Sequence, residues 1–232
     1  MRLWHCVDAR SFRVLWALEE LGLDYELILL GFPPRVRDRR IFEVNPLGTV
    51  PAFEAGRTVM TESSAICEWL AEQHPASRLS VATDEPARAE YLNWLHQADT
   101  TLTFPQAVHL RYAYLETEDR RLPQAAEDYR RWFLGRLKLL SSALASRDYV
   151  CAGRFTMADI AVSYALSLSE DLGLDADLPG VVRAYLRHVT DRDGWRRAKA
   201  AQEEAARAAG LPVEAPARLL RRSVLAGSPD AA

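Results

Sequence analysis

The sequence changes its periodicity once, near residue 80, and this change most limits how the chain can fold. Before about residue 75, short apolar runs alternate with stretches of helical spacing, a pattern typical of α/β structure. After residue 86, apolar residues such as Tyr91, Leu95 and Leu102 recur at helical spacing, and no strand pattern intervenes. The polar segment 75–85 has no periodicity, so we expect the domain boundary there.

The first part of the chain predicts a βαβ unit followed by a ββα unit. Gly22 stands where the C-cap of the first helix belongs. The strands on either side of that helix are expected to be parallel, whereas a tight turn at Gly56 makes the later two strands antiparallel. The expected elements are a strand at 3–7, a helix ending at 21, a strand at 25–30, a short irregular helix at 35–40, strands at 50–53 and 58–61, and a helix at 64–73.

The second part of the chain predicts only helices. Pro105 lies inside the first of them and is expected to kink it. The tail 210–232 contains three prolines and two glycines, so we expect a loosely packed extension. The expected helices span 87–116, 123–145, 156–171, 179–190 and 194–209, so the predicted divisions of the chain are 1–76, 86–209 and 210–232.

Composition excludes several classes of function. Lys plus Arg number 29 and Asp plus Glu number 32, so the net charge of −3 lacks the basic footprint of a nucleic-acid-binding protein. No apolar run approaches the ~18 residues of a membrane span, and charges at 8, 10 and 13 interrupt any signal-peptide core. Three widely spaced cysteines do not suit a disulfide framework. We therefore expect a cytoplasmic protein with neither a nucleic-acid nor a membrane partner.

The sequence carries no pattern for a metal or a nucleotide. Its five histidines show no metal-ligand spacing, and no glycine-rich phosphate loop is present. Neither group is therefore expected as a cofactor. Thr156 and Asp159 have the spacing of a helix capping box, with Asp in place of the usual Glu or Gln, and this motif predicts a structural role.

Three sequence strings, in the order and spacing found here, resemble the soluble glutathione S-transferase family as found in bacteria. They are SFRVLWALEELGLDYEL at 11–27, NPLGTVPAF at 45–53 followed by TESSAICEWL at 61–70, and GRFTMADIAVSYAL at 153–166. The resemblance covers about residues 1–205. It implies a thioredoxin-like α/β domain that binds glutathione, followed by an all-α helical bundle, and a homodimer.

The resemblance gives Val50 and Pro51 a role in binding glutathione. It implies a cis Val50-Pro51 bond, an isomer found in only ~5% of X-Pro bonds. That geometry exposes the Val50 backbone for pairing with the cysteinyl main chain of the tripeptide. Taken alone, Pro51 is equally compatible with an ordinary proline at the start of a strand.

Glu62 and Ser63 stand where the third helix begins. The free N–H groups and dipole of a helix N-terminus attract an anion. Ser63 is therefore suited to the α-carboxylate of a γ-glutamyl group, and Glu62 to its α-ammonium. The alternative is a plain N-cap with an acidic neighbour. The resemblance also implies that Asp99 reaches the ammonium of a partner's glutathione, with a solvated helix-face carboxylate as the alternative.

Conjugation requires glutathione as a thiolate, yet the pKa of a free thiol is near ~8.5. Family members lower it with a hydroxyl or thiol near the start of the first helix. If Arg13 matches the arginine four residues after that group, the slot holds Ala9, which has no hydroxyl. Ser11 is the candidate donor, with helix N-capping as its alternative. Arg10 is a second candidate, because a nearby cation stabilises a thiolate; its alternative is a solvated loop arginine.

Cysteine chemistry is not favoured. Cys6 falls within the first strand, where a buried structural thiol is expected. Cys67 and Cys151 have no CxxC partner. Similar isomerases carry a Ser-Ser-Cys cluster where this chain has Asp8-Ala9-Arg10, a departure that weakens an isomerase interpretation.

The prediction is an enzyme, a glutathione transferase that joins the glutathione thiolate to small hydrophobic electrophiles. One alternative is a glutathione-binding protein with weak or no catalysis, because Ala9 occupies the usual serine slot. A further alternative is a glutathione-dependent isomerase or peroxidase. A basic partner for the glycyl carboxylate is expected among the arginines at 35, 37, 39 and 40.

Overall fold

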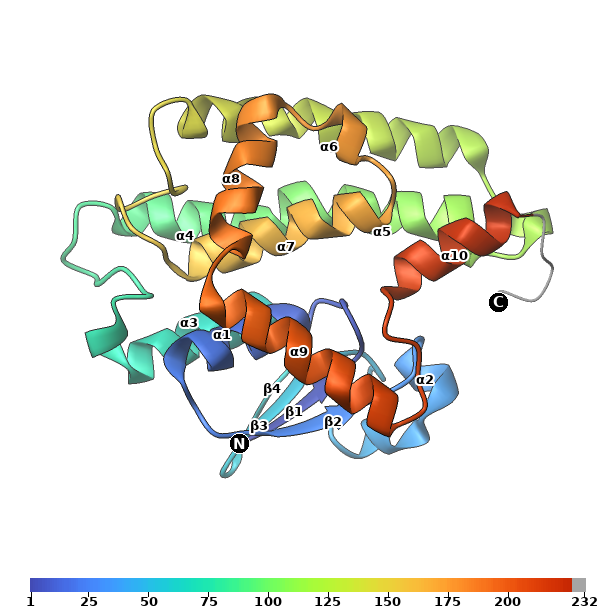
Figure 1. Cartoon of the computed structure of the whole chain (residues 1–232), viewed down its shortest axis with the longest axis horizontal. Helices are drawn as coiled ribbons and strands as arrows, with labels where there is room; N and C mark the ends of the chain where they lie inside the picture. Colours follow the sequence, from blue (N-terminus) through green and yellow to red (C-terminus); the bar gives the residue numbers. More distant parts are fainter. Residues whose placement is uncertain (227–232) are drawn as a thin grey trace. The chain divides into compact units, whose positions relative to one another are not determined.

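The computed structural model of the chain describes residues 1–226 and divides into two compact units (Figure 1). The first unit contains residues 1–80 and 190–216, and the second contains 81–189 and 217–226. The sequence boundary at 75–85 therefore falls where the chain first passes between units. The second crossing, near residue 190, has no counterpart in the sequence analysis.

The first unit is built on a four-stranded sheet with the order β2-β1-β3-β4. Strand β1 pairs parallel with β2 and antiparallel with β3, and β3 pairs antiparallel with β4. Both predicted pairings, the parallel and the antiparallel one, are confirmed. The strands are β1 (Arg2–His5), β2 (Glu26–Leu29), β3 (Ala52–Ala55) and β4 (Thr58–Met60), and the helices are α1 (Phe12–Leu21), α2 (Pro34–Arg37), α3 (Ser63–Gln73) and α9 (Asp193–Ala208), with a 3-10 turn at Arg39–Glu43.

Helix α1 is the buried helix of this unit. Residues 12–18 are all buried, and α1 packs against β1, α3 and α9. Gly22 ends the helix with φ +64, so its predicted role as C-cap is confirmed. A left-handed residue at this point costs glycine nothing, because it has no Cβ.

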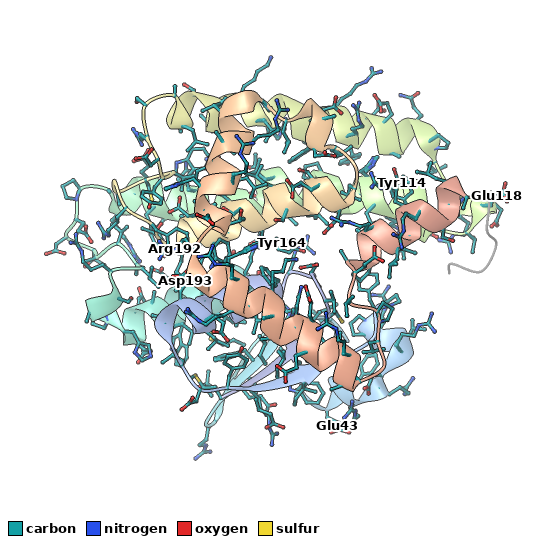
Figure 2. All side chains as sticks on the ribbon, viewed as in Figure 1. Glu43, Tyr114, Glu118, Tyr164, Arg192 and Asp193 are labelled. Atoms are coloured by element: carbon teal, nitrogen blue, oxygen red, sulfur yellow. The ribbon has the colours of Figure 1, made fainter. Side chains whose placement is uncertain are left out.

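Helix α9 belongs to the first unit, although its periodicity alone placed it with the helical domain. Figure 1 shows α9 running alongside α1. Trp195 of α9 packs edge-on against Phe12 and Trp16, with ring centroids 4.9 Å from each. Arg192, labelled at the start of α9 in Figure 2, forms two hydrogen bonds of 2.9 and 2.8 Å with Glu20. These partners are more than 170 residues away in sequence, so periodicity cannot identify them.

The second unit is helical. The stretch predicted as one kinked helix is α4 (Arg88–Gln97), a π-helical segment at Ala98–Thr103, α5 (Phe104–Leu110) and a second π-helical segment at Arg111–Leu115. Pro105 lies in the first turn of α5, so the irregularity expected from this proline is accommodated one turn earlier. The remaining helices are α6 (Pro123–Leu144), α7 (Met157–Asp171), α8 (Gly180–Thr190) and α10 (Pro216–Leu225).

The capping box at the start of α7 is confirmed. The Thr156 side chain accepts from the Asp159 backbone, and the Thr156 N–H donates to Asp159 Oδ2 at 2.9 Å. Asp159 Oδ1 also accepts from the Val150 N–H at 3.0 Å and from the Tyr185 hydroxyl at 2.9 Å. All these groups are buried. The motif thus ties α7 both to the preceding loop and to α8.

The tail differs from its prediction, because residues 216–225 form helix α10 rather than a loose extension. Ala217 is buried, and Arg218 donates to Asp171 Oδ1 at 2.8 Å. The three prolines of the tail predict irregular structure, yet residues 216–225 form a short amphipathic helix. The last six residues of the predicted tail, 227–232, lie outside the described residues. Within residues 1–226, no helix has the length and hydrophobicity needed to cross a bilayer.

The capping box yields a stability prediction. Thr156→Ala removes the hydroxyl that caps α7, so the free energy of unfolding should fall by about 1 to 2 kcal/mol. Chemical denaturation measures this change. Thr83→Ala, at an exposed loop position, is the matched control and should change stability by less than about 0.5 kcal/mol. Equal stability of Thr156→Ala and wild type would show that the capping bonds contribute nothing.

Candidate active site

Three chain segments meet at one edge of the sheet. Because β3 is antiparallel to β1, the end of β1 lies beside the start of β3, where Trp4 pairs with Ala52. Because β4 is antiparallel to β3, Met60 at the end of β4 lies beside Phe53 near the start of β3. The chain then continues from Met60 into α3. The loop 8–11, residues 50–51 and the first turn of α3 therefore share this edge, which we call the site edge.

The predicted cis bond between Val50 and Pro51 is confirmed. Val50 is half-buried and packs, with Ala9 from the loop 8–11, against one hydrophobic cluster below the site edge. The buried members of that cluster are Trp4, Cys6, Leu30, Ile41 and Ala52. Shared packing on this cluster fixes the start of β3 close to the loop that precedes α1.

The turn before Val50 is held by Asn45. Its Nδ2 donates to the Thr49 carbonyl at 2.9 Å, and its Oδ1 accepts from the Leu47 N–H at 3.0 Å. Gly48 has φ +62, and a Cβ there would lie 2.8 Å from the Phe42 ring. Both the backbone conformation and the close approach require glycine. This turn therefore delivers Val50 to the site edge in one defined conformation.

Glu62 and Ser63 open α3 at the site edge. Glu62 occupies the N-cap position with extended backbone (φ −97, ψ 115), and its side chain makes no capping bond. It is exposed, whereas Ser63 is buried. The alternative in which Ser63 is a plain N-cap is wrong, because Glu62 holds the N-cap position and Ser63 is the first residue of α3. The exposed Glu62 carboxylate stands at the helix N-terminus.

Arg13 is the site residue that sequence reasoning missed. It was used only to align the loop, yet its side chain is fully buried, and its Nη1 donates to Ser63 Oγ at 3.1 Å. A charged side chain is almost never buried without a partner. The signal available in the sequence was a charged residue between Phe12 and Val14, at the start of a helix that is otherwise apolar as far as Leu18. Arg13 adds a cation to the positive end of α3, which suits an anionic ligand.

The loop 8–11 places its three candidate residues differently. Arg10 is exposed and Ala9 is half-buried, while Ser11 is fully buried. Ser11 occupies the N-cap position of α1 but makes no side-chain capping bond. Its Oγ lies 2.7 Å from His5 Nδ1 and accepts weakly from the Cys6 N–H at 3.4 Å. The hydroxyl is thus directed toward β1 rather than toward the first turn of α1.

A buried polar network continues from His5 to helix α9. His5 Nε2 lies 3.0 Å from Gln202 Oε1, which also accepts from the Asp8 N–H at 3.1 Å. Gln202 Nε2 donates to Asp8 Oδ1 at 2.9 Å, and Lys199 Nζ donates to the same oxygen at 2.6 Å. His5, Ser11 and Gln202 are all at most 1% exposed. We call these five side chains, His5, Asp8, Ser11, Lys199 and Gln202, the α9 network.

Burial determines the ionisation of two groups beside this loop. Desolvation lowers the pKa of His5 to about 4, so the imidazole is neutral near pH 7. Desolvation also raises the pKa of the Cys6 thiol to about 12. Cys6 is a free buried thiol, as predicted, and it is not ionised at neutral pH. Cys67 and Cys151 are likewise free and buried.

Asp99 and the arginines at 35, 37, 39 and 40 are the remaining predicted residues. Arg40 forms an ion pair with Asp38, with Nη2 and Oδ2 2.5 Å apart, while the arginines at 35, 37 and 39 are exposed. Asp99 is half-buried in the π-helical segment of the second unit. Among residues 1–226, no three His, Cys, Asp or Glu side chains gather as a metal site would require.

Comparisons with known proteins agree with this geometry. Residues 9–73 match the family described as "Glutathione S-transferase, N-terminal domain". The chain is 31% identical over 191 residues to glutathione S-transferase GstB of Escherichia coli, covering 80% of this chain and 90% of that protein. It is 26% identical over 194 residues to glutathione S-transferase A of Pleuronectes platessa, covering 82% of this chain and 86% of that protein. A solved sphingomonad glutathione S-transferase, complexed with glutathione, superposes with a TM-score of 0.74 at 26% identity, covering 85% of this chain and 96% of that one.

The ionisation of His5 yields a pH prediction. Its folded pKa of about 4 lies below the unfolded value of 6.5, so its contribution to stability is complete above pH 6.5. As the pH falls from 6.5 to 4, the unfolded chain binds a proton that the folded chain does not. The difference in unfolding free energy between wild type and His5→Gln should therefore shrink by about 3 kcal/mol over this range.

The comparison with His5→Gln isolates this term from other groups. Burial raises the pKa of Asp159 to about 6, which gives an opposite slope, but that term is common to both proteins. Urea unfolding at several pH values measures the difference. His96→Gln, at an exposed position, should keep the wild-type pH dependence. A constant difference between wild type and His5→Gln would contradict the neutral, buried imidazole.

Proposed function

From the premise that this chain belongs to the glutathione S-transferase family, we propose that it is an enzyme that binds glutathione at the site edge and joins its thiol to small hydrophobic electrophiles. The observation that carries the proposal is the Arg13–Ser63 hydrogen bond of 3.1 Å at the start of α3. It places a buried cation and a hydroxyl at a helix end that opens beside Val50. The sphingomonad relative that binds glutathione supports the same ligand here.

The γ-glutamyl end of glutathione is assigned to the first turn of α3. Its α-carboxylate would meet Ser63, the helix N-terminus and the positive potential of Arg13. Its α-ammonium would meet the exposed carboxylate of Glu62, which makes no capping bond of its own. The α-ammonium and α-carboxylate, which share one carbon of the ligand, thus face the Glu62 carboxylate and the positive end of α3 beside Arg13.

The cysteinyl part of glutathione is assigned to Val50. An extended peptide that pairs with the main chain of Val50, beyond the end of β3, would bind by a miniature form of strand addition. The β3–β4 pairing brings the first turn of α3 to the same end of the sheet as Val50. Pairing at Val50 is therefore compatible with the γ-glutamyl assignment. In that orientation the thiol points toward the loop 8–11, because this loop and Val50 pack on the same cluster.

Activation of the thiol is assigned to the loop 8–11. The exposed Arg10 guanidinium and the positive end of α1 both favour a thiolate over a thiol. Ser11 is the remaining candidate donor, and its hydroxyl is 2.7 Å from His5. The thiol proton is released to solvent, the thiolate attacks the electrophilic carbon to form an S–C bond, and the bond from that carbon to the leaving group breaks with its electron pair. Holding both reactants together supplies the rest of the rate enhancement.

A second candidate function is glutathione binding with weak or no catalysis. It is favoured by one observation, namely that Ala9 in the usual serine slot offers no hydroxyl to a thiol. Measurable glutathione affinity without conjugation of an aryl halide would support this alternative. The homodimer, the cytoplasmic location and the contact of Asp99 with a partner's glutathione also belong to the proposal and rest on family resemblance.

Variants of the α3 N-terminus test the binding site. Glu62→Gln removes the charge that pairs with the α-ammonium, and Ser63→Ala removes the hydroxyl at the α-carboxylate. Each should raise the dissociation constant of glutathione about tenfold or more, since a hydrogen bond to a charged group contributes roughly 1.5 to 3 kcal/mol. Isothermal titration calorimetry measures this constant.

The matched control lies at the other end of the same helix. Glu72→Gln changes an exposed carboxylate near the C-terminus of α3 and should leave glutathione affinity within about twofold of wild type. If the double variant Glu62→Gln, Ser63→Ala binds glutathione as tightly as wild type, the assignment of the γ-glutamyl group is refuted.

A further inference from the structure

The contacts within the α9 network determine which of its groups donate a proton in each hydrogen bond. They therefore determine whether the Ser11 hydroxyl can donate to a ligand. The starting point is the amide of Gln202, which has one acceptor oxygen and one NH2 donor. The Asp8 N–H faces one end of this amide and the Asp8 carboxylate faces the other. With the oxygen toward the N–H, both contacts are hydrogen bonds. The opposite orientation would place donor against donor and acceptor against acceptor in a buried site, which is costly.

The orientation of Gln202 fixes the tautomer of His5. Because Gln202 Oε1 can only accept, His5 Nε2 must carry the proton in their 3.0 Å contact. A neutral imidazole carries a single proton, and burial keeps His5 neutral near pH 7. Nδ1 is therefore a bare acceptor.

The tautomer of His5 in turn fixes the proton of Ser11. Nδ1 lies 2.7 Å from Ser11 Oγ, and because Nδ1 has no proton, the hydroxyl must donate. Ser11 has only one hydroxyl proton, and the Cys6 N–H approaches the same oxygen as a donor. The Ser11 side chain, fully buried, thus has no proton left to donate to a sulfur atom.

Lys199 completes the network on the side of α9. Its ammonium is 2.6 Å from Asp8 Oδ1 and lies 5.1 Å from the ring of Phe12 and 5.4 Å from that of Trp195. Asp8 itself has φ +49, a left-handed conformation that residues other than glycine rarely adopt. Bonds from Gln202 to both the N–H and the carboxylate of Asp8 hold this conformation, and Asp8 directly precedes Ala9 and Arg10.

We infer that helix α9 positions the thiol-activating loop: Gln202 and Lys199 hold Asp8, Gln202 directs the His5 proton to Nε2, and Ser11 donates to His5 as a positioning residue. The inference deepens the proposed function and rests on it for the identity of the loop as thiol-activating. It assigns thiol activation to Arg10 and the first turn of α1. It also gives α9, some 190 residues away in sequence, a role in the site.

The first test reads the protons directly and needs no ligand. Long-range proton–nitrogen NMR, on protein with isotopically labelled histidine, distinguishes the two neutral tautomers, and His5→Gln identifies the His5 signals. We expect a proton on Nε2 and a bare Nδ1 near pH 7. A proton on Nδ1 would overturn the inference, because Ser11 would then accept from His5 and keep its own proton for a ligand.

The second test separates positioning from catalysis by conjugation kinetics with glutathione and an aryl halide. Ser11→Ala removes the bond to His5 and should lower kcat/KM by about threefold to tenfold, without moving the midpoint of its pH profile. Gln202→Met should lower kcat about tenfold with little change in the KM for glutathione, and should move that midpoint to higher pH. Glu204→Met, on the exposed face of α9, is the matched control and should match wild type.

Other outcomes are equally decisive. A loss of about a hundredfold or more in Ser11→Ala, with Gln202→Met at the wild-type level, would overturn the inference and make Ser11 a catalytic residue. If Gln202→Met does not fold, Lys199→Met serves in its place, because it removes only the cation on Asp8. Its midpoint should also move to higher pH, by a smaller amount. If wild type binds no glutathione by calorimetry, the proposed function fails, and the His5 tautomer still decides the proton assignment.

Discussion

Strand β3 runs antiparallel to β1, and this pairing places the end of β1 beside the start of β3. Because β4 then returns antiparallel to β3, the first turn of α3 arrives at the same edge. The loop before α1, the cis Val50-Pro51 step and the α3 N-terminus converge there, although the first and the last are more than fifty residues apart in sequence. With β3 parallel to β1, these segments would lie at opposite ends of the sheet. The mixed topology is thus what creates a single site from three short stretches of chain.

Two buried polar side chains then give the site edge its electrostatics. Arg13 carries a positive charge from α1 to the start of α3, where it meets Ser63. Gln202 links α9 to the loop 8–11 through His5 and Asp8. Both are expensive to bury without partners, and both have them. In each case a part of the site, Ser63 or the loop 8–11, is held by a residue that a ligand need not touch.

Much of this arrangement follows from local sequence signals. Short apolar runs and helical spacing predict the four strands and the helices that follow them. Gly22 and the Thr156–Asp159 box predict helix ends, and the Val50-Pro51 string predicts a cis bond by resemblance. These features depend on neighbours within a few residues. The same reasoning locates Glu62 and Ser63 at a helix N-terminus.

The features that escaped prediction depend on distant partners. The place of α9 follows from Trp195 packing on Phe12 and from Gln202 bonding to His5, and neither contact leaves a periodic trace. To predict that Arg13 is buried, one must know that α1 is covered on every side. Whether the Ser11 hydroxyl donates to a thiol or to His5 depends on the tautomer of His5. That tautomer is fixed by Gln202, which lies 191 residues after Ser11 in the sequence. Helix α10 was obscured because prolines are local signals for irregular structure, and they dominate its flanks.

The site edge is proposed to bind glutathione with its thiol ionised by the loop before α1. Ultraviolet difference spectroscopy of glutathione mixed with the protein, followed across pH, tests it most directly, because thiolate absorbs where thiol does not. We expect a thiolate signal that titrates at least about one pH unit below the free-thiol value of ~8.5. Glutathione that binds by calorimetry but titrates as it does in free solution would contradict it.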